Sequence, residues 1–253
     1  MRIVIAAPPK TGNSWLKCLY SEIYRLTWLR GDQTPATISP DEFREWLEAG
    51  GFPDDSVFHH HYDYSPEFCD TADAHGVNVT TIVRNPYDQF VSLYHFVQAQ
   101  ADNEERQAKG RPADVMVGKP IDHPDALAYL ADGFGRDLVK GIEWLGSGRT
   151  VVVRYEALHD DPLAELRRAT GQIAPVDDER LRAAIEACQA ANLLQSRKGL
   201  KKRIRSATAN DWPNHLTAAH LRIFQEQLAD EVRALGYRVE DPATALLAGG
   251  SPA

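Results

Sequence analysis

The chain has 253 residues, of which 43% are hydrophobic and 25% charged, a composition suited to one globular α/β domain with a sizeable core. The net charge of -8 argues against a broad nucleic-acid surface but allows a local basic pocket for one small anion. No secretory leader and no run of eighteen apolar residues is present, and the three cysteines are scattered. These features predict a cytoplasmic protein with no membrane span and no disulfide framework.

The first element is a buried strand over residues 2–7, a β-branched apolar run that ends at two prolines. Apolar residues then recur at helical spacing from 13 to 29. Lys10, Gly12 and short polar residues separate the two elements, and N–H groups at a helix start attract anions. The segment therefore predicts a phosphate-binding loop; the alternative is an ordinary turn with a surface lysine. It is not the common nucleotide-binding loop, because its lysine precedes its glycine.

The later elements alternate between strands and helices. Each follows from apolar period, caps and turn residues: helix 40–50, strand 56–62, strand 78–84, helix 85–100, strand 149–158, helix 160–171, helix 177–194 and helix 217–237. This alternation predicts an α/β fold, a parallel sheet with helices on both faces. We expect one domain over 1–240 and a frayed tail over 241–253, with a polar binding loop, lid or disordered segment over 100–123.

A second charge stands where a strand meets a helix. Arg84 ends the predicted strand, Asn85 is suited to cap the next helix, and Ser92 lies about two turns into that helix. An arginine fork and a serine hydroxyl could hold one phosphate. Taken separately, Arg84 is better explained by a salt bridge at the end of the strand, and Ser92 by a solvated helix surface.

Four segments, in order, resemble those of the cytosolic-type sulfotransferases. PPKTGNSWL resembles their 5′-phosphosulfate loop, and IVRNPYDQFVSLYHF resembles their 3′-phosphate motif, R-N-P-x-D-x-x-V-S-x-Y-H-F. VVRYEALHDDPLAEL and NDWPNHLT are similar to the family's Y-E-D-x-x-x-D-P-x-x-E-L and G-D-W-x-N-H-F-T segments. The matches span residues 3–217. The resemblance implies a three-layer P-loop-like fold and transfer of a sulfuryl group from 3′-phosphoadenosine 5′-phosphosulfate (PAPS) to a hydroxyl or amine of a small molecule.

The resemblance also implies a role for each matching residue. Lys10 would contact the 5′-phosphosulfate and stabilise the leaving oxygen. Trp15 would stack on adenine, and Tyr155 would lie near the adenine base. Arg84 and Ser92 would hold the 3′-phosphate. The backbone of the loop would wrap the 5′-phosphate; its residues are Thr11, Gly12, Asn13 and Ser14, of which Asn13 departs from the family's serine or threonine.

The general base falls in the stretch VFHHHYDY. Ungapped alignment with the family's K-[ST]-H places His59 at the lysine and His61 at the catalytic histidine. Histidine suits this role because its pKa lies near neutrality. Along a strand His59 and His61 would share one face and His60 the other, and whether His59 or His60 shares the base role stays open. We expect no metal, since no carboxylate or cysteine pair stands at zinc spacing.

The remaining family features are weaker. Arg205 has the family's spacing to Asp211 for a 3′-phosphate contact, while the Arg197–Lys198 pair is the alternative. The Ser-Phe pair that helps to hold the nucleotide is missing from CQAANLL, and the C-terminal dimer motif is absent, so the oligomeric state stays open. Two rival functions remain: a P-loop kinase or phosphotransferase, and an inactive module that binds PAPS or its product PAP (3′-phosphoadenosine 5′-phosphate).

Overall fold

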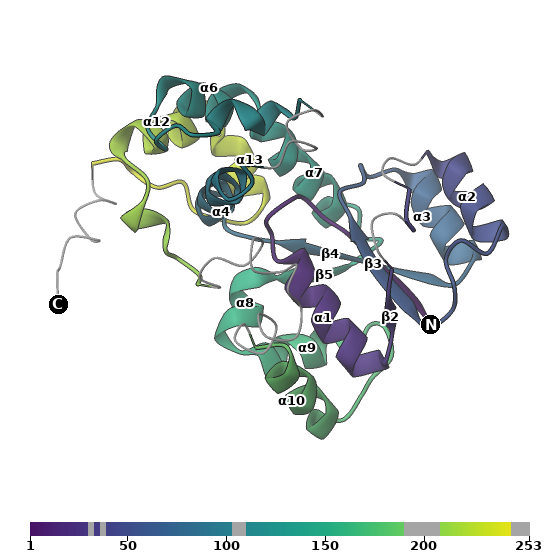
Figure 1. Cartoon of the computed structure of the whole chain (residues 1–253). Helices are drawn as coiled ribbons and strands as arrows, with labels where there is room; N and C mark the ends of the chain where they lie inside the picture. Colours follow the sequence, from purple (N-terminus) through teal and green to yellow (C-terminus); the bar gives the residue numbers. More distant parts are fainter. Residues whose placement is uncertain (30–32, 36–38, 103–109, 190–207, 244–253) are drawn as a thin grey trace. The chain divides into compact units, whose positions relative to one another are not determined.

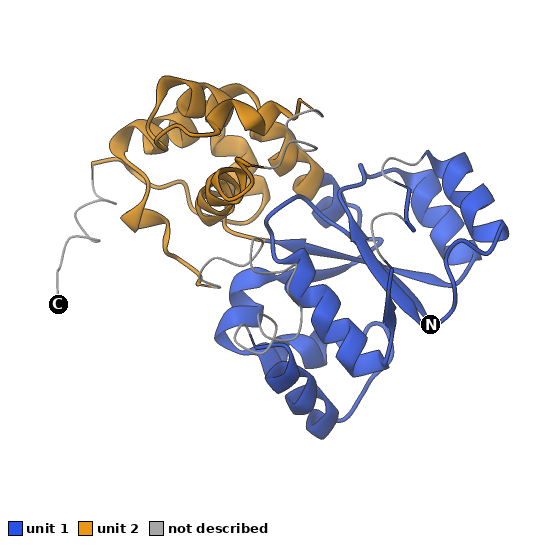
Figure 2. Ribbon diagram, in the orientation of Figure 1, with its two compact units in different colours: residues 1–83, 143–193 blue, residues 84–142, 194–253 orange. Residues whose placement is uncertain are grey.

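The computed structural model describes residues 1–29, 33–35, 39–102, 110–189 and 208–243. The chain divides into two compact units, coloured separately in Figure 2. Unit 1 comprises residues 1–83 and 143–193, and unit 2 comprises residues 84–142 and 194–253. Because each unit is built from two separate stretches of chain, the first unit resumes after the second has begun. The single domain expected over residues 1–240 stays a prediction.

Unit 1 contains a parallel sheet of five strands. Its strands are β1 Arg2–Ala6, β2 Thr27–Trp28, β3 Ser56–His60, β4 Val77–Val83 and β5 Val151–Arg154. Their order across the sheet is β2-β3-β1-β4-β5, so β1 lies at the centre. The apolar side chains of β1 are fully buried, as expected for a strand with both faces covered. The predicted α/β fold is confirmed.

Helices cover both faces of this sheet (Figure 1). The helices of unit 1 are α1 Asn13–Tyr24, α2 Pro40–Glu48, α3 Pro66–Ala74, α8 Tyr155–Asp160, α9 Pro162–Thr170 and α10 Asp178–Ala187. Val77 and Val79 of β4 pack into an aromatic core with residues of α2 and α3. Ile82, which has the opposite parity along β4, faces the loop before α1.

Unit 2 is helical. Its elements are α4 Pro86–Gln98, the 3-10 helix η1 Pro112–Met116, α6 Pro124–Asp132, the 3-10 helix η3 Trp212–Asn214, α12 Ala218–Gln227 and α13 Ala229–Ala234, while α7 Gly135–Gly146 crosses the unit boundary. Aromatic rings from α4, α12 and the turn between α6 and α7 meet in the core: the ring centroid of Phe90 lies 5.4 Å from that of Phe134, and that of Tyr87 lies 4.2 Å from that of Phe224. This core joins α4, near the start of unit 2, to α12, near its end.

Several element boundaries differ from those predicted. The helix expected over 13–29 ends at Tyr24, because Arg25 adopts a left-handed conformation (φ 57°). The strand expected over 149–158 ends at Arg154, because its partner β4 ends opposite it, and Tyr155 begins a helix. The helix expected over 217–237 breaks at Leu228. Hydrogen bonds from Leu228 to Phe224 and from Val232 to Leu228 keep the helical period across the break, so periodicity did not reveal it.

The expectation of no disulfide is wrong. Cys18 of α1 is bonded to Cys188, at the end of α10, with their Cα atoms 6.0 Å apart. Both cysteine side chains are buried, and 170 positions separate them in sequence. A separation this long leaves no local sequence signal, whereas the packing of α1 against α10 brings the pair together.

Candidate active site

The loop between β1 and α1 depends on glycine at position 12. Gly12 caps α1 with φ 111°, a conformation that residues with a side chain rarely adopt. A Cβ atom there would stand 2.7 Å from Cδ2 of Tyr155 and 3.1 Å from Cδ1 of Ile82. Glycine is therefore required both by the backbone conformation and by the close approach of Tyr155.

Two polar side chains of this loop turn inward. Thr11 Oγ1 and Asn13 Nδ2 both donate to the carbonyl of Pro8, at 2.9 Å and 2.8 Å, and both side chains are buried. They therefore brace the loop. If Asn13 contacts a ligand, its backbone is better placed to do so than its amide.

The backbone of the same loop is arranged to receive an anion. Within the described residues, the N–H groups of Gly12, Asn13 and Ser14 have no hydrogen-bond acceptor. Three consecutive donors at the start of a helix, where the helix dipole is positive, favour a bound phosphate or sulfate. Lys10 precedes them with φ 68°, an uncommon conformation for a non-glycine residue, and its side chain is half-buried.

An aromatic pair stands beside the loop. The ring centroids of Trp15 and Tyr155 lie 5.8 Å apart, with an angle of 69° between the ring planes. Trp15 is half-buried and Tyr155 is buried. The two residues come from the first turn of α1 and the first residue of α8, so the structure brings together the loop and the third sequence motif within unit 1.

The later residues of the third motif, VVRYEALHDDPLAEL, have structural roles. Asp161 caps α9 by accepting the N–H of Ala164, and Glu165 Oε1 accepts the N–H of Arg154 at the end of β5. Glu165 is buried and also paired with Arg168. These contacts hold the end of β5, and hence the start of α8 at Tyr155.

His61 lies one residue beyond β3, at the edge of the sheet where β1 also ends. Its Nδ1 lies 2.8 Å from the carbonyl oxygen of Ala7, which follows β1. Donation of an Nδ1 proton to this carbonyl would fix the tautomer whose Nε2 carries the lone pair, the form needed for a general base. The imidazole is exposed, so a substrate proton could reach it.

The neighbouring histidines differ from His61. His60 stacks on Tyr62 with ring centroids 4.3 Å apart, and its Nδ1 accepts the N–H of His61. The strand expected to include His61 ends at His60, so His61 lies one residue beyond it; the ring centroids of His59 and His61 lie 6.2 Å apart. The His60 ring is engaged in packing on Tyr62 and in the hydrogen bond from the N–H of His61, which leaves His61 as the better candidate base.

The junction between β4 and α4 is arranged differently. Asn85 caps α4 by accepting the N–H of Tyr87, as the sequence predicted. Arg84 donates from Nη2 to the carbonyl of Thr208 at 2.9 Å. Ser92 is half-buried two turns into α4. Arg84 and Ser92 belong to unit 2, and the candidate 5′-phosphosulfate residues belong to unit 1.

Sequence reasoning missed the role of Asp88. This carboxylate is buried and accepts the backbone N–H groups of Asn210 (2.6 Å) and Trp212 (2.9 Å). Its place in the chain indicates only an acidic residue in the first turn of α4. Its partners lie 122 and 124 positions away, so only its place in the motif around Arg84 hinted at more. Arg205 and the Arg197–Lys198 pair lie outside the described residues.

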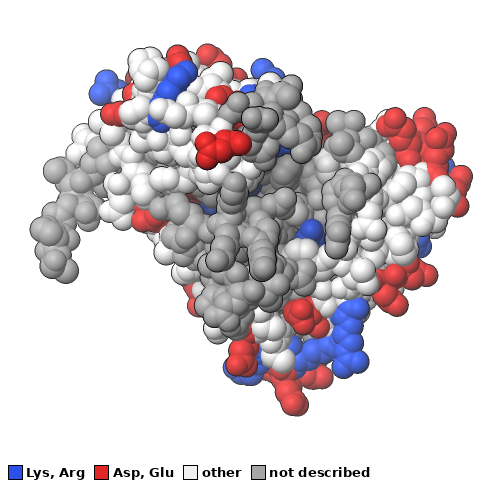
Figure 3. All heavy atoms as spheres, in the orientation of Figure 1, with Lys and Arg blue, Asp and Glu red and all other residues white. Residues whose placement is uncertain are grey.

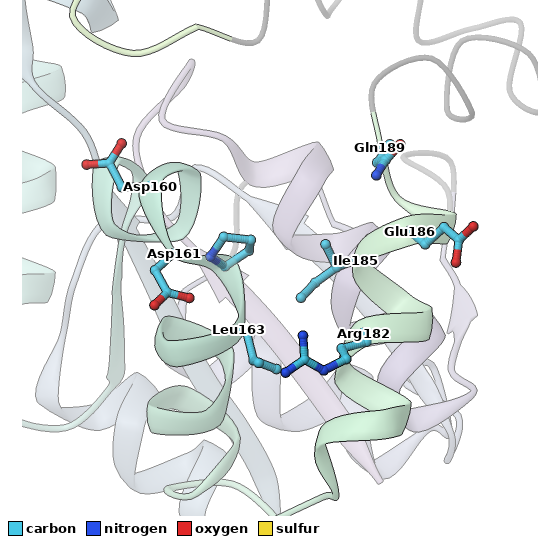
Figure 4. A pocket seen from close by; sticks show the side chains of 8 residues that line it. Asp160, Asp161, Leu163, Arg182, Ile185, Glu186 and Gln189 are labelled. Carbon is cyan, nitrogen blue, oxygen red and sulfur yellow. The ribbon is translucent and has the colours of Figure 1, made fainter.

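An open pocket of about 530 Å³ lies elsewhere in unit 1, between α8–α9 and α10 (Figure 4). Its lining includes Asp161, Leu163, Arg182 and Glu186, and none of the predicted site residues. The pocket is therefore not part of the candidate site.

Three further observations concern the surface charge, possible metal sites and possible membrane-spanning helices. Acidic side chains gather at α2 and α3 on the face shown in Figure 3. In the parts of the chain that are described, no three His, Cys, Asp or Glu side chains cluster as metal ligands would. Nor does any helix there have both the length and the apolar character that crossing a bilayer requires.

Comparisons with known proteins identify a family and a shared fold. A family profile described as "Sulfotransferase domain" matches residues 1–236. The chain is 24% identical over 269 residues to "Cytosolic sulfotransferase 15" of Arabidopsis thaliana, covering 92% of this chain and 72% of the relative.

Solved structures share the fold. A mouse sulfotransferase, SULT7A1, complexed with PAP, has a TM-score of 0.65 at 18% identity, over 92% of this chain and 84% of that one. A retinol dehydratase in complex with androsterone and inactive cofactor PAP has a TM-score of 0.61 at 12% identity, over 96% and 84%.

Proposed function

This chain belongs to the sulfotransferase domain family, and we propose that it transfers the sulfuryl group of PAPS to a hydroxyl or amine of a small molecule. The observation that carries the proposal is the row of three N–H donors at Gly12, Asn13 and Ser14, shaped by a glycine that no other residue can replace without strain. Such a row recognises a phosphosulfate through its backbone, which explains how Asn13 can stand where the family has serine or threonine.

We assign the rest of the nucleotide by its chemistry. Lys10 supplies a positive charge beside the N–H row, and Trp15 offers an aromatic face to adenine next to Tyr155. Arg84 and Ser92 hold the 3′-phosphate, the group that distinguishes PAPS from common adenine nucleotides. Arg205 completes this site in the proposal. Structures of the mouse relative and of the retinol dehydratase with PAP support the choice of nucleotide.

We assign the proton transfer to His61. PAPS supplies a sulfur atom bonded to a phosphate oxygen that can leave. His61 takes the proton of the acceptor hydroxyl through Nε2 as the acceptor oxygen bonds to sulfur, while the contact with Ala7 holds the ring. Lys10 and the N–H row stabilise the negative charge that grows on the departing phosphate oxygen.

The acceptor in this proposal is a small molecule. The complexes of retinol dehydratase with androsterone and with retinol support that class. The aromatic side chains of Tyr62 and Phe68 are buried in the core of unit 1, so the acceptor is selected by other side chains.

We place the protein in the cytoplasm on the name of its plant relative. The Cys18–Cys188 bond is unusual for that compartment, where thiols are kept reduced. Mass spectrometry of protein alkylated at lysis would decide whether the bond exists in the cell.

An assay of group transfer tests the proposal. Purified protein is incubated with PAPS and a panel of phenols, aliphatic alcohols and amines, and both released PAP and sulfated acceptor are measured. We expect equimolar PAP and sulfated product with at least one acceptor class. PAP binding without transfer to any class of acceptor would contradict the proposal that the protein is an enzyme and would favour an inactive binding module. Transfer that requires magnesium and ATP would favour a kinase.

A further inference from the structure

A buried carboxylate in the first turn of α4 has no role in the mechanism above. Asp88 is only 2% exposed, and an ionised carboxylate at such a position needs strong partners. Its two oxygen atoms accept different backbone N–H groups, Oδ2 from Asn210 and Oδ1 from Trp212. Both bonds are charge-assisted, and both go to one short stretch of chain. The carboxylate therefore fixes the segment 208–212 against α4.

The same segment holds Arg84. The carbonyl of Thr208, two residues before Asn210, accepts from Nη2 of Arg84 at 2.9 Å. The segment is further held by Trp212, whose ring lies 4.9 Å from that of Tyr87. The contacts form a closed circuit within unit 2: Asp88 fixes the segment, the segment fixes the guanidinium, and Arg84 and Asp88 are four residues apart.

We infer that Asp88 is a positioning residue for 3′-phosphate recognition, acting through the segment 208–212 on the guanidinium of Arg84. The inference rests on the proposed function, since it requires Arg84 to bind the 3′-phosphate. Arginine recognises phosphate through a planar fork, so its orientation matters as well as its charge. The hydrogen bond to Thr208 holds one of the five N–H donors of Arg84 and so restrains the plane of the fork.

The test compares two nucleotides and two substitutions. PAP carries the 3′-phosphate and AMP does not, so the ratio of their dissociation constants reports recognition of that group alone. Asp88→Asn keeps the shape of the side chain but offers one acceptor instead of two, so one N–H loses its partner. We expect PAP to bind about 10-fold or more weakly to this variant, by the usual strength of a hydrogen bond to a charged group, and AMP to bind as to wild type.

A double-mutant cycle separates positioning from a general loss of structure. If Asp88 acts through Arg84, then Asp88→Asn should weaken PAP little further in a protein that already carries Arg84→Ala. Equal weakening of PAP and AMP, or additive effects of the two substitutions on PAP, would overturn the inference.

A second variant keeps the test decisive if Asp88→Asn does not fold. Asn210 is exposed and has φ 59°, so Asn210→Val should displace its N–H from Asp88 without disturbing the core, while Asn210→Gly should preserve it. We expect the valine variant alone to lose selectivity for PAP over AMP, and equal selectivity in both variants would contradict us. If wild type binds PAP through Arg84 but the substitutions at positions 88 and 210 leave the PAP affinity unchanged, only this inference fails. If wild type does not bind PAP, the proposed function fails with it.

Discussion

The two strand-to-helix junctions to which we assign phosphate binding are built in opposite ways. After β1, the loop is shaped by its own neighbours: Gly12 provides the backbone conformation, and Thr11 and Asn13 reach back to Pro8. After β4, the side chains of Arg84 and Asp88 reach to residues 208–212, more than 120 positions away. The first junction presents backbone donors, and the second presents a side chain held by distant chain. A local motif can therefore specify the first, whereas the second requires the whole of unit 2 to fold.

The largest effect should come from the base beside the first junction. We expect His61→Ala to lower kcat by about 10²–10⁴-fold, the usual contribution of general base catalysis, with the affinity for PAP unchanged. The measurement is steady-state kinetics together with calorimetric titration of PAP. His60→Ala is the matched control, because the His60 ring stacks on Tyr62 and its hydrogen bond with Ala7 is made by the backbone carbonyl, which the substitution keeps; this variant should keep most of the turnover. Full activity in His61→Ala would remove His61 from the mechanism.

The next effect concerns the glycine of the first junction. We expect Gly12→Ala to reduce the free energy of unfolding by about 2–4 kcal/mol, because the new methyl group meets Tyr155 and the φ of 111° is strained. Unfolding in urea measures this change. Gly50→Ala, also at positive φ (74°) but with no atom within 4 Å of the new Cβ, is the control for backbone strain alone and should lose only about 1–2 kcal/mol. Equal losses in the two variants would show that the contact with Tyr155 is unimportant.

A smaller effect tests whether the first junction is braced from within. Thr11→Val and Asn13→Ala each leave one donor on the carbonyl of Pro8, so each should reduce the free energy of unfolding by about 0.5–1.5 kcal/mol. The double variant should lose more than the sum, since the carbonyl then has neither donor. Urea unfolding of all four proteins measures the coupling, and strict additivity would refute the shared brace.

The smallest expected effect is a pH dependence of the free energy of unfolding, caused by a buried histidine in unit 2. His220 is buried, with Nε2 3.0 Å from the carbonyl of Ile121, and burial lowers its pKa despite that hydrogen bond. As the pH falls through the ordinary histidine range, the unfolded chain takes up a proton that the folded chain refuses, so unfolding becomes easier. We expect wild type to be more stable at pH 7.5 than at pH 5.5.

The control for this pH effect is His220→Asn, in which the difference between the two pH values should shrink. Comparison with the variant is needed because Asp137, whose pKa burial raises to about 6, acts in the opposite direction: stability falls as the pH rises from the ordinary aspartate pKa toward 6. An unchanged difference in the variant would exclude His220 as its source.

The sequence predicted what local chemistry decides. Asn85 as a helix cap, the short strand before the first loop and the glycine of that loop all follow from neighbouring residues, and the structure confirms the cap and the strand. The features that the sequence could not predict depend on residues that are distant in sequence. The partners of Asp88, the bond between Cys18 and Cys188 and the end of β5 at Arg154 each depend on contacts with distant chain. The roles of Lys10, Trp15, Ser92 and the other assigned side chains stay predictions.

One crossed measurement tests the central claim that the first junction recognises the 5′ end of the nucleotide and the second the 3′-phosphate. PAP and AMP are titrated calorimetrically, without metal, into wild type, Gly12→Ala and Arg84→Ala. We expect Gly12→Ala to weaken both nucleotides by similar factors, because both carry the 5′-phosphate, and Arg84→Ala to weaken PAP alone, by about 10-fold or more. Equal weakening of AMP and PAP by Arg84→Ala, or a wild-type protein that prefers AMP to PAP, would contradict the division of labour between the two junctions.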